Sequence, residues 1–128
     1  MKETKLNTIT NLFEGNEIRS VWDIEREDYY FSVVDVVAAL TESNIPKRYW
    51  TDLKRKLIEE GSELYEKIVQ LKMPAEYGKW RATYCANTET MFRIIQSIPS
   101  PKADHIKQWL AKVGYEKIRE IKDPELAQ

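Results

Sequence analysis

The stretch YYFSVVDVVAAL (residues 29–40) decides the fold, because the spacing of its apolar residues changes within it. Its first four residues are typical of a β-strand, and EIRSVWDI (17–24), rich in β-branched and aromatic residues, precedes them across a charged turn. From Val33 onward the apolar residues recur at helical spacing, and Ser32 with Asp35 fits a capping box. The sequence therefore predicts a β-hairpin that leads directly into a helix.

The segment NIPKRYWTDLKRKLIEEG (44–61) predicts a second helix that carries both core and cationic side chains. Asn44 is a suitable N-cap, Pro46 suits the first turn, and Gly61 ends the helix. Its predicted core face consists of Pro46, Tyr49, Trp50, Leu53 and Leu57. Beside that face lies a band of cations, interrupted by Asp52 and formed by Lys47, Arg48, Lys54 and Arg55.

A second β-hairpin is predicted farther along the chain. KIVQLKM (67–73) and KWRATYC (79–85) both alternate apolar with polar residues, and PAEYG (74–78) between them is a turn sequence. We expect the polar face of this hairpin to show Lys72 and Arg81, with Lys79 at the turn. The hairpin then resembles a β-ribbon that can touch phosphates.

Two or three helices follow the second hairpin. Asn87 can cap the first, which has Arg93 on one face and an apolar line on another. SIPSP (97–101) contains the next boundary, and Gly114 is expected to stop or kink the helix that follows before it continues to Asp123. The order of elements predicts a single α+β domain, with two antiparallel β-hairpins and four to five packed helices. Its expected limits are residues 17–122, after a flexible arm (1–16) and before a tail (123–128).

Composition excludes several classes of protein. No apolar run reaches the roughly 20 residues needed to cross a bilayer, and no signal-like segment opens the chain, so we expect a cytoplasmic protein without a membrane partner. One cysteine and one histidine exclude a disulfide framework and a zinc site, and no cofactor is expected. Cys85 is predicted to be a buried small hydrophobe. The carboxylates near residues 23–28 fit a solvated loop better than a metal-dependent nuclease site, so no enzyme is predicted.

The charges are segregated along the chain, although they sum to only −1. Residues 1–43 carry a net charge of −5, whereas residues 44–58 and 79–112 each carry +4. A one-sided positive field draws a protein toward phosphate backbones. Solvated lysines on the outer faces of helices explain the charge alone equally well.

Two segments resemble the Bro-N domain, the N-terminal domain of the BRO and prophage antirepressor family. YYFSVVDVVAAL resembles the family's strand-to-helix opening, and CANTETMFRIIQSIPSPKADHIKQWLAKVGYEKIREI (85–121) resembles its second signature, with Thr90 where the family has Gly. The resemblance covers roughly residues 17–122, and DNA-damage-inducible protein D-like proteins share this domain. Many antirepressors add a variable C-terminal region, whereas this chain stops at DPELAQ, as an excised domain or a minimal member would.

The resemblance implies a DNA-binding domain in the transcription regulation of phage or prophage genes, with double-stranded DNA as partner. The residues predicted to contact DNA are Lys47, Arg48, Lys54, Arg55, Lys72, Lys79, Arg81 and Arg93. Three of the four tryptophans, at positions 50, 80 and 109, are expected in the core rather than on stacking platforms. A homodimer would double the basic surface.

An alternative from another class is a protein-interaction module that holds a repressor. Its support is the number of aromatic residues, 14 in 128, including the pairs Tyr29–Tyr30 and Tyr49–Trp50. A large exposed cluster of Trp and Tyr favours this alternative, whereas a contiguous Lys/Arg face favours DNA.

Overall fold

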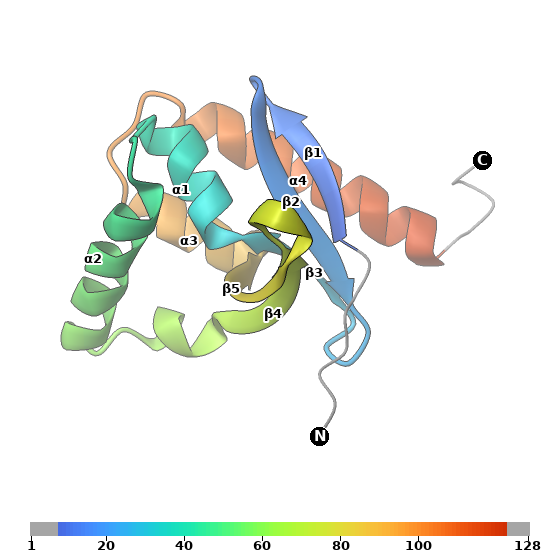
Figure 1. Cartoon of the computed structure of the whole chain (residues 1–128), viewed down its shortest axis with the longest axis horizontal. Helices are drawn as coiled ribbons and strands as arrows, with labels where there is room; N and C mark the ends of the chain where they lie inside the picture. The colour runs from blue at the N-terminus through green and yellow to red at the C-terminus, as the bar shows by residue number, and fades with distance from the viewer. Residues whose placement is uncertain (1–7, 123–128) are drawn as a thin grey trace.

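Five strands form one antiparallel sheet in the order β1-β2-β3-β5-β4 (Figure 1). The structure is a computed structural model that describes residues 8–122. The strands are β1 (Thr8–Phe13), β2 (Asn16–Asp23), β3 (Asp28–Ser32), β4 (Val69–Pro74) and β5 (Trp80–Asn87). The helices are α1 (Val33–Thr41), α2 (Pro46–Glu59), α3 (Thr88–Gln96) and α4 (Ala103–Lys122), with short 3-10 turns at Glu63–Lys67 and Glu76–Gly78. The predicted α+β class is confirmed.

Both predicted hairpins are present, but they are not separate units. β3 pairs with β5, with Phe31 opposite Ala86, and this contact joins the two hairpins into a single sheet. Phe31 and Ala86 are 55 positions apart in the sequence, so no local sequence pattern predicts this pairing. The two hairpins therefore belong to one five-stranded sheet.

The predicted flexible arm, residues 1–16, is wrong for its second half. Residues 8–13 form β1 and pair with β2 along their whole length, from Thr8 opposite Val21 to Phe13 opposite Asn16. Phe13 is buried, and its ring meets that of Trp109 edge-on at 5.8 Å. Both residues of the connecting turn, at positions 14 and 15, have positive φ, which is the pattern of a type I′ hairpin turn. Residues 1–7 and the predicted tail, 123–128, lie outside the described residues.

A side-chain cap marks the start of α1 but not of α2. Ser32 caps α1 as predicted, since its Oγ accepts a hydrogen bond from the Asp35 amide at 3.4 Å. The prediction that Asn44 caps α2 is wrong, because Ile45 occupies the N-cap position and offers no side-chain acceptor. Pro46 opens α2 and Gly61 follows its end with φ +67°, both as predicted.

Helix α4 runs without interruption through Gly114, which neither stops the helix nor marks a new one. A Cβ at this position would lie 2.8 Å from Thr88 Oγ1 and 3.8 Å from the Phe31 ring. The glycine therefore permits close packing of α4 against β3 and the start of α3. Its role is steric rather than conformational.

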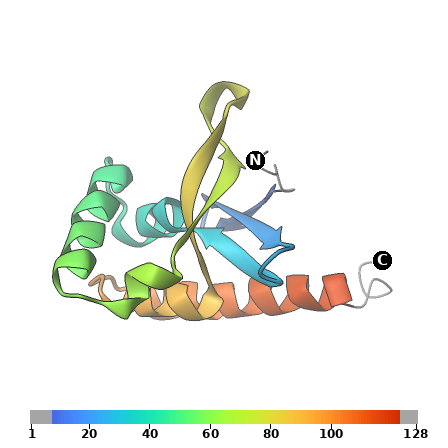
Figure 2. The same ribbon diagram turned by 90° about the horizontal axis from the view of Figure 1, so that it is seen from below.

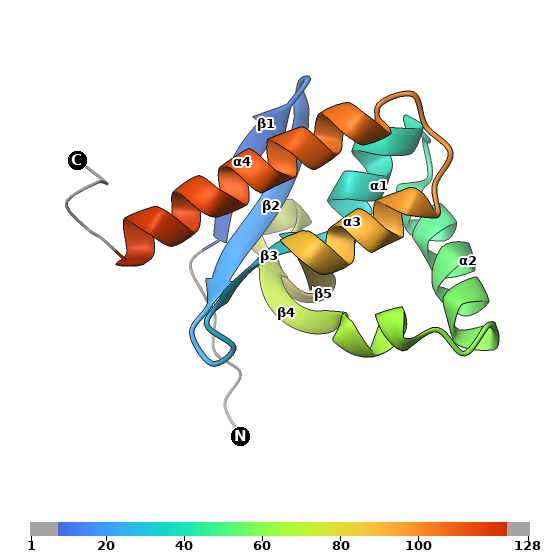
Figure 3. The same cartoon turned by 180° about the vertical axis from the view of Figure 1, so that it is seen from behind.

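The second hairpin projects away from the layer that two of the helices form. α3 and α4 form a layer along one side, and the β4–β5 hairpin rises away from it with its tip standing clear (Figures 2 and 3). The main core contains the apolar faces of α1, α2, α3 and α4 together with Phe31. A smaller cluster of Val21, Tyr30, Met73 and Cys85 supports the hairpin base. Cys85 is fully buried, as predicted.

Candidate nucleic-acid interface

Arg19 fixes the base of the protruding hairpin. From β2, its Nε donates to Asp35 Oδ2 of α1 at 2.8 Å, and its Nη1 donates to the Pro74 carbonyl of β4 at 2.7 Å. Nη2 also reaches Ser32 Oγ at 3.3 Å. One guanidinium thus ties β2, β4 and the first turn of α1 together, while Asp35 compensates its charge.

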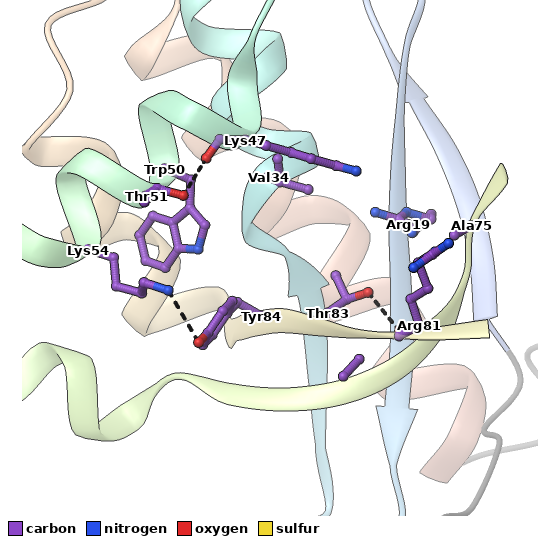
Figure 4. Close-up of a pocket in the computed structure, with 11 residues that line it drawn as sticks. Arg19, Val34, Lys47, Trp50, Thr51, Lys54, Ala75, Arg81, Thr83 and Tyr84 are labelled. Carbon is purple, nitrogen blue, oxygen red and sulfur yellow. Dashed lines mark hydrogen bonds between the residues drawn. The ribbon is translucent and has the colours of Figure 1, made fainter. Parts of the chain in front are cut away.

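A groove lies between α2 and the β4–β5 hairpin (Figure 4), with a cavity volume of about 240 Å³. Four of its lining side chains are cations, drawn from three strands and helices: Arg19 (β2), Lys47 and Lys54 (α2), and Arg81 (β5). Among the described residues no carboxylate lines it. The rest of the lining consists of Val34, Trp50, Thr51, Ala75, Ala82, Thr83 and Tyr84.

Lys54, Tyr84 and Trp50 form one end of the groove. Lys54 Nζ donates to Tyr84 Oη at 3.3 Å and lies 4.3 Å from the centre of the Tyr84 ring. The Tyr84 ring meets the Trp50 ring edge-on at 6.0 Å. The hydrogen bond from Lys54 lowers the pKa of Tyr84, and the hydrogen bond to Tyr84 raises the pKa of Tyr65. The Trp50 side chain is only 4% exposed, and its Nε1–H has no partner among the described groups.

The structure brings together three of the predicted DNA-contacting residues in one groove. Lys47 and Lys54 come from the predicted cationic band of α2, and Arg81 comes from the predicted polar face of the second hairpin. None of the three forms an ion pair with a carboxylate of the described chain. When no carboxylate lies next to a cation, nothing offsets the attraction of that cation for an anionic ligand. These three side chains therefore define the cationic groove.

The other two cations predicted on α2 do not line the groove. Arg48 and Arg55 are exposed elsewhere on the helix, and Arg55 Nη2 lies 3.3 Å from Asp52 Oδ1. Residues 47, 51 and 54 share one stripe of α2, whereas 48 and 55 lie about 100° farther round. The continuous band predicted along α2 is therefore divided between two faces.

The predicted polar face of the hairpin is also wrong. Met73 pairs with Arg81 and Lys72 pairs with Ala82, so Lys72 and Arg81 point to opposite faces of the ribbon. The five residues 75–79 between the paired Pro74 and Trp80 set this register. A face that holds both cations would need an even number of turn residues. Lys79 lies at the turn and is exposed, as predicted.

Arg93 is exposed on α3, within the helical layer on the side away from the hairpin tip (Figure 2). It does not line the groove.

The tryptophans follow the prediction only in part. Trp50 is buried, whereas Trp80 and Trp109 are half-buried, and Trp109 packs against Phe13.

Sequence reasoning missed two residues of this site. Arg19 lies in a strand, and its partner Asp35 is 16 residues away, so no helical or strand spacing links them. Tyr84 belongs to the apolar series of the alternating segment KWRATYC (79–85), and only the folded chain places it under Lys54. The carboxylates near the β2–β3 turn are also not all solvated, since Asp23 is buried and accepts from Arg26 Nη1 at 2.6 Å.

Among the helices that the structure describes, none has the length and apolar character to cross a bilayer. No three His, Cys, Asp or Glu side chains within residues 8–122 gather as metal ligands would.

The comparisons with known proteins identify the family. A family model described as the BRO family, N-terminal domain, matches residues 17–117. Neither a curated protein nor a solved structure matches the chain. The match takes in the α2 and β4–β5 walls of the cationic groove and leaves β1 outside. Because it spans well over half of the 128 residues, the chain belongs to the BRO family through its N-terminal domain, Bro-N.

Proposed function

We propose that this domain binds double-stranded DNA, with the cationic groove as its contact surface. The observation that carries the proposal is the convergence of Lys47, Lys54 and Arg81 on one groove without a lining carboxylate. Lysine and arginine contacts with phosphates release counterions and supply most of non-specific DNA affinity. Family membership supports a role in regulating phage or prophage genes, as part of an antirepressor-like protein of the cytoplasm.

The shape of the hairpin also supports a DNA partner. A two-stranded β-ribbon fits the major groove of B-DNA, and β4–β5 projects from the sheet with Lys79 near its tip (Figure 2). Arg19 holds the hairpin base against α1, and Lys54 and Trp50 of α2 contact Tyr84 of β5, so α2 lies beside the ribbon. When the ribbon enters the major groove of a duplex, a sugar–phosphate backbone of the DNA comes close to Lys47 and Lys54 of α2.

The exposed aromatic residues support the alternative, capture of a repressor protein, less well. Tyr77 and Tyr115 are the only strongly exposed large aromatic side chains in residues 8–122. One lies at the hairpin tip and the other on α4, in the layer on the other side (Figure 2). They do not form the contiguous apolar patch that a protein partner would use. We therefore favour a binding domain for DNA over a module for a repressor, and over an enzyme.

The test is fluorescence-anisotropy binding of the full chain to a random 20-base-pair duplex across a salt series. We expect the slope of log affinity against log salt to fall by about 0.9 for each phosphate contact removed. The Lys47→Gln/Lys54→Gln/Arg81→Gln variant should lose both affinity and slope. If it binds like the wild type, the groove is not the contact surface, and if the wild type shows no salt-dependent binding, the proposal fails.

A matched control removes three cations that do not line the groove. The Arg48→Gln/Arg55→Gln/Arg93→Gln variant changes the net charge by the same amount and should keep most of the wild-type slope. Equal losses in the two triple variants would show a diffuse charge effect rather than a site. Sedimentation velocity with and without duplex then tests whether a homodimer forms.

A further inference from the structure

Tyr77 occupies an unusual position at the tip of the β4–β5 hairpin. Its side chain is 95% exposed, the most exposed of the large apolar side chains in residues 8–122. Its backbone is left-handed, with φ 60° and ψ 28°, and Gly78 follows with φ 72°. The Ala75 amide donates to the Lys79 carbonyl at 2.6 Å, which closes the turn around it.

Folding does not explain a tyrosine there. Left-handed backbone is disfavoured for a residue with a Cβ, and glycine or asparagine adopts it more readily. A ring that stays almost wholly in solvent gains no burial in return. A strained, exposed aromatic residue at the end of a projecting ribbon is therefore better explained by contact with a partner.

The neighbours of Tyr77 indicate the chemistry of that partner. Lys79 is two residues away at the same tip, and Arg81 follows on β5 at the edge of the cationic groove. Glu76 is the one carboxylate within the turn. A flat ring that two cations follow within four residues suits a polyanion with stacked aromatic groups, which nucleic acid provides.

We propose that Tyr77 is a stacking wedge, whose ring inserts partly at a base step of duplex DNA while Lys79 and Arg81 hold the flanking phosphates. The inference rests on the proposed DNA binding. Side chains that enter between base pairs unstack them locally and bend the duplex. The tip is the part of the hairpin farthest from the α3–α4 layer (Figure 2), and it contains Tyr77, so this residue is among the first parts of the ribbon to meet a groove.

The experiment compares Tyr77→Ala and Tyr77→Phe by anisotropy on the duplex, over the same salt series. Tyr77→Ala should bind about tenfold more weakly, equivalent to about 1.4 kcal/mol, with an unchanged salt slope because no phosphate contact is lost. Tyr77→Phe keeps the ring and should bind like the wild type. Tyr115→Ala, which removes the other strongly exposed tyrosine, is the matched control and should have no effect.

A second measurement reports the insertion itself. In a set of duplexes that each carry one 2-aminopurine, the wild type and Tyr77→Phe should raise the fluorescence of at least one probe, as unstacking does. Tyr77→Ala should not raise it. Tyr77→Asn, which suits the left-handed backbone, should melt at or above the wild-type temperature and still bind weakly, so lost binding cannot be attributed to unfolding.

The outcomes separate this inference from the proposed function. Wild-type affinity in Tyr77→Ala, or equal losses in Tyr77→Phe and Tyr77→Ala, would overturn the wedge while DNA binding stands. An unchanged 2-aminopurine signal with the wild type at saturation would do the same. If the wild type does not bind the duplex at all, the proposed function fails first and the wedge fails with it.

Discussion

Arg19 and Asp35 form a bidentate ion pair between β2 and α1. Nε lies 2.8 Å from Oδ2 and Nη2 lies 3.1 Å from Oδ1, with side chains 21% and 16% exposed. The same guanidinium donates to the Pro74 carbonyl at the hairpin base. The pair therefore holds β2 against α1, and through Arg19 it also fixes the base of the hairpin that forms one wall of the cationic groove.

Arg19→Met should lower the free energy of unfolding by about 2–3 kcal/mol, because it leaves a half-buried carboxylate and a carbonyl without their donor. Urea denaturation followed by circular dichroism measures this loss. Arg19→Met/Asp35→Asn should lose less than the sum of the two single variants, since the unpaired carboxylate is gone. Additive losses would show that the pair contributes little beyond packing.

Local patterns could predict the elements that bury a regular apolar face. The β2–β3 hairpin, the Ser32 cap and the core line of α3 follow from spacing alone. β1 was missed because it is an edge strand, and its apolar residues Ile9 and Leu12 are exposed rather than alternating inward. The segment therefore lacks the strict alternation of apolar and polar residues that marks a half-buried strand.

The candidate site depended on geometry that spacing does not contain. Lys47, Lys54 and Arg81 were each predicted to contact DNA, but their meeting in one groove follows from the long-range pairing of β3 with β5. The separation of Lys72 from Arg81 follows from the parity of the turn. A single-residue shift in register moves a side chain to the other face.

Gly114→Ala should destabilise the protein although alanine is the better helix former. The added Cβ would overlap Thr88 Oγ1 at 2.8 Å, and such overpacking costs about 1–3 kcal/mol, against about 1 kcal/mol gained in helix propensity. In a Thr88→Ala background the same substitution should be stabilising, because only ordinary contacts with Phe31 remain. Thermal melts of the wild type, the two single variants and the double variant measure whether the effect of Gly114→Ala on the melting temperature changes sign.

Cys85 should be unreactive in the folded protein. Burial raises the pKa of its thiol to about 12, so almost no thiolate exists at pH 8. A thiol-specific disulfide reagent should modify it only at the rate of unfolding, and at full rate in denaturant. The raised pKa also predicts that the free energy of unfolding falls between about pH 9 and pH 12, where only the unfolded chain loses the proton.

Lys54 and Tyr84 provide a reporter of the charge in the groove. Because the hydrogen bond from Lys54 lowers the pKa of Tyr84, the Tyr84 phenol should ionise before ordinary tyrosines in a carbon-13 NMR titration. Lys54→Gln should move that pKa upward. The lowered pKa adds its full stability above the pKa of the unfolded chain, about 10, and this contribution is lost as the pH falls from there through the lower folded value.

The same reporter tests whether Lys54 reaches a phosphate. A bound backbone that draws the ammonium group away from Tyr84, and adds its own negative charge, should raise the pKa of Tyr84 in the wild-type complex. Lys54→Gln has no ammonium group to lose, so its Tyr84 pKa should change less when duplex is added. An unchanged Tyr84 titration at saturating DNA would place the phosphates elsewhere on the protein, because a charge bound within the groove cannot leave a lining phenol unaffected.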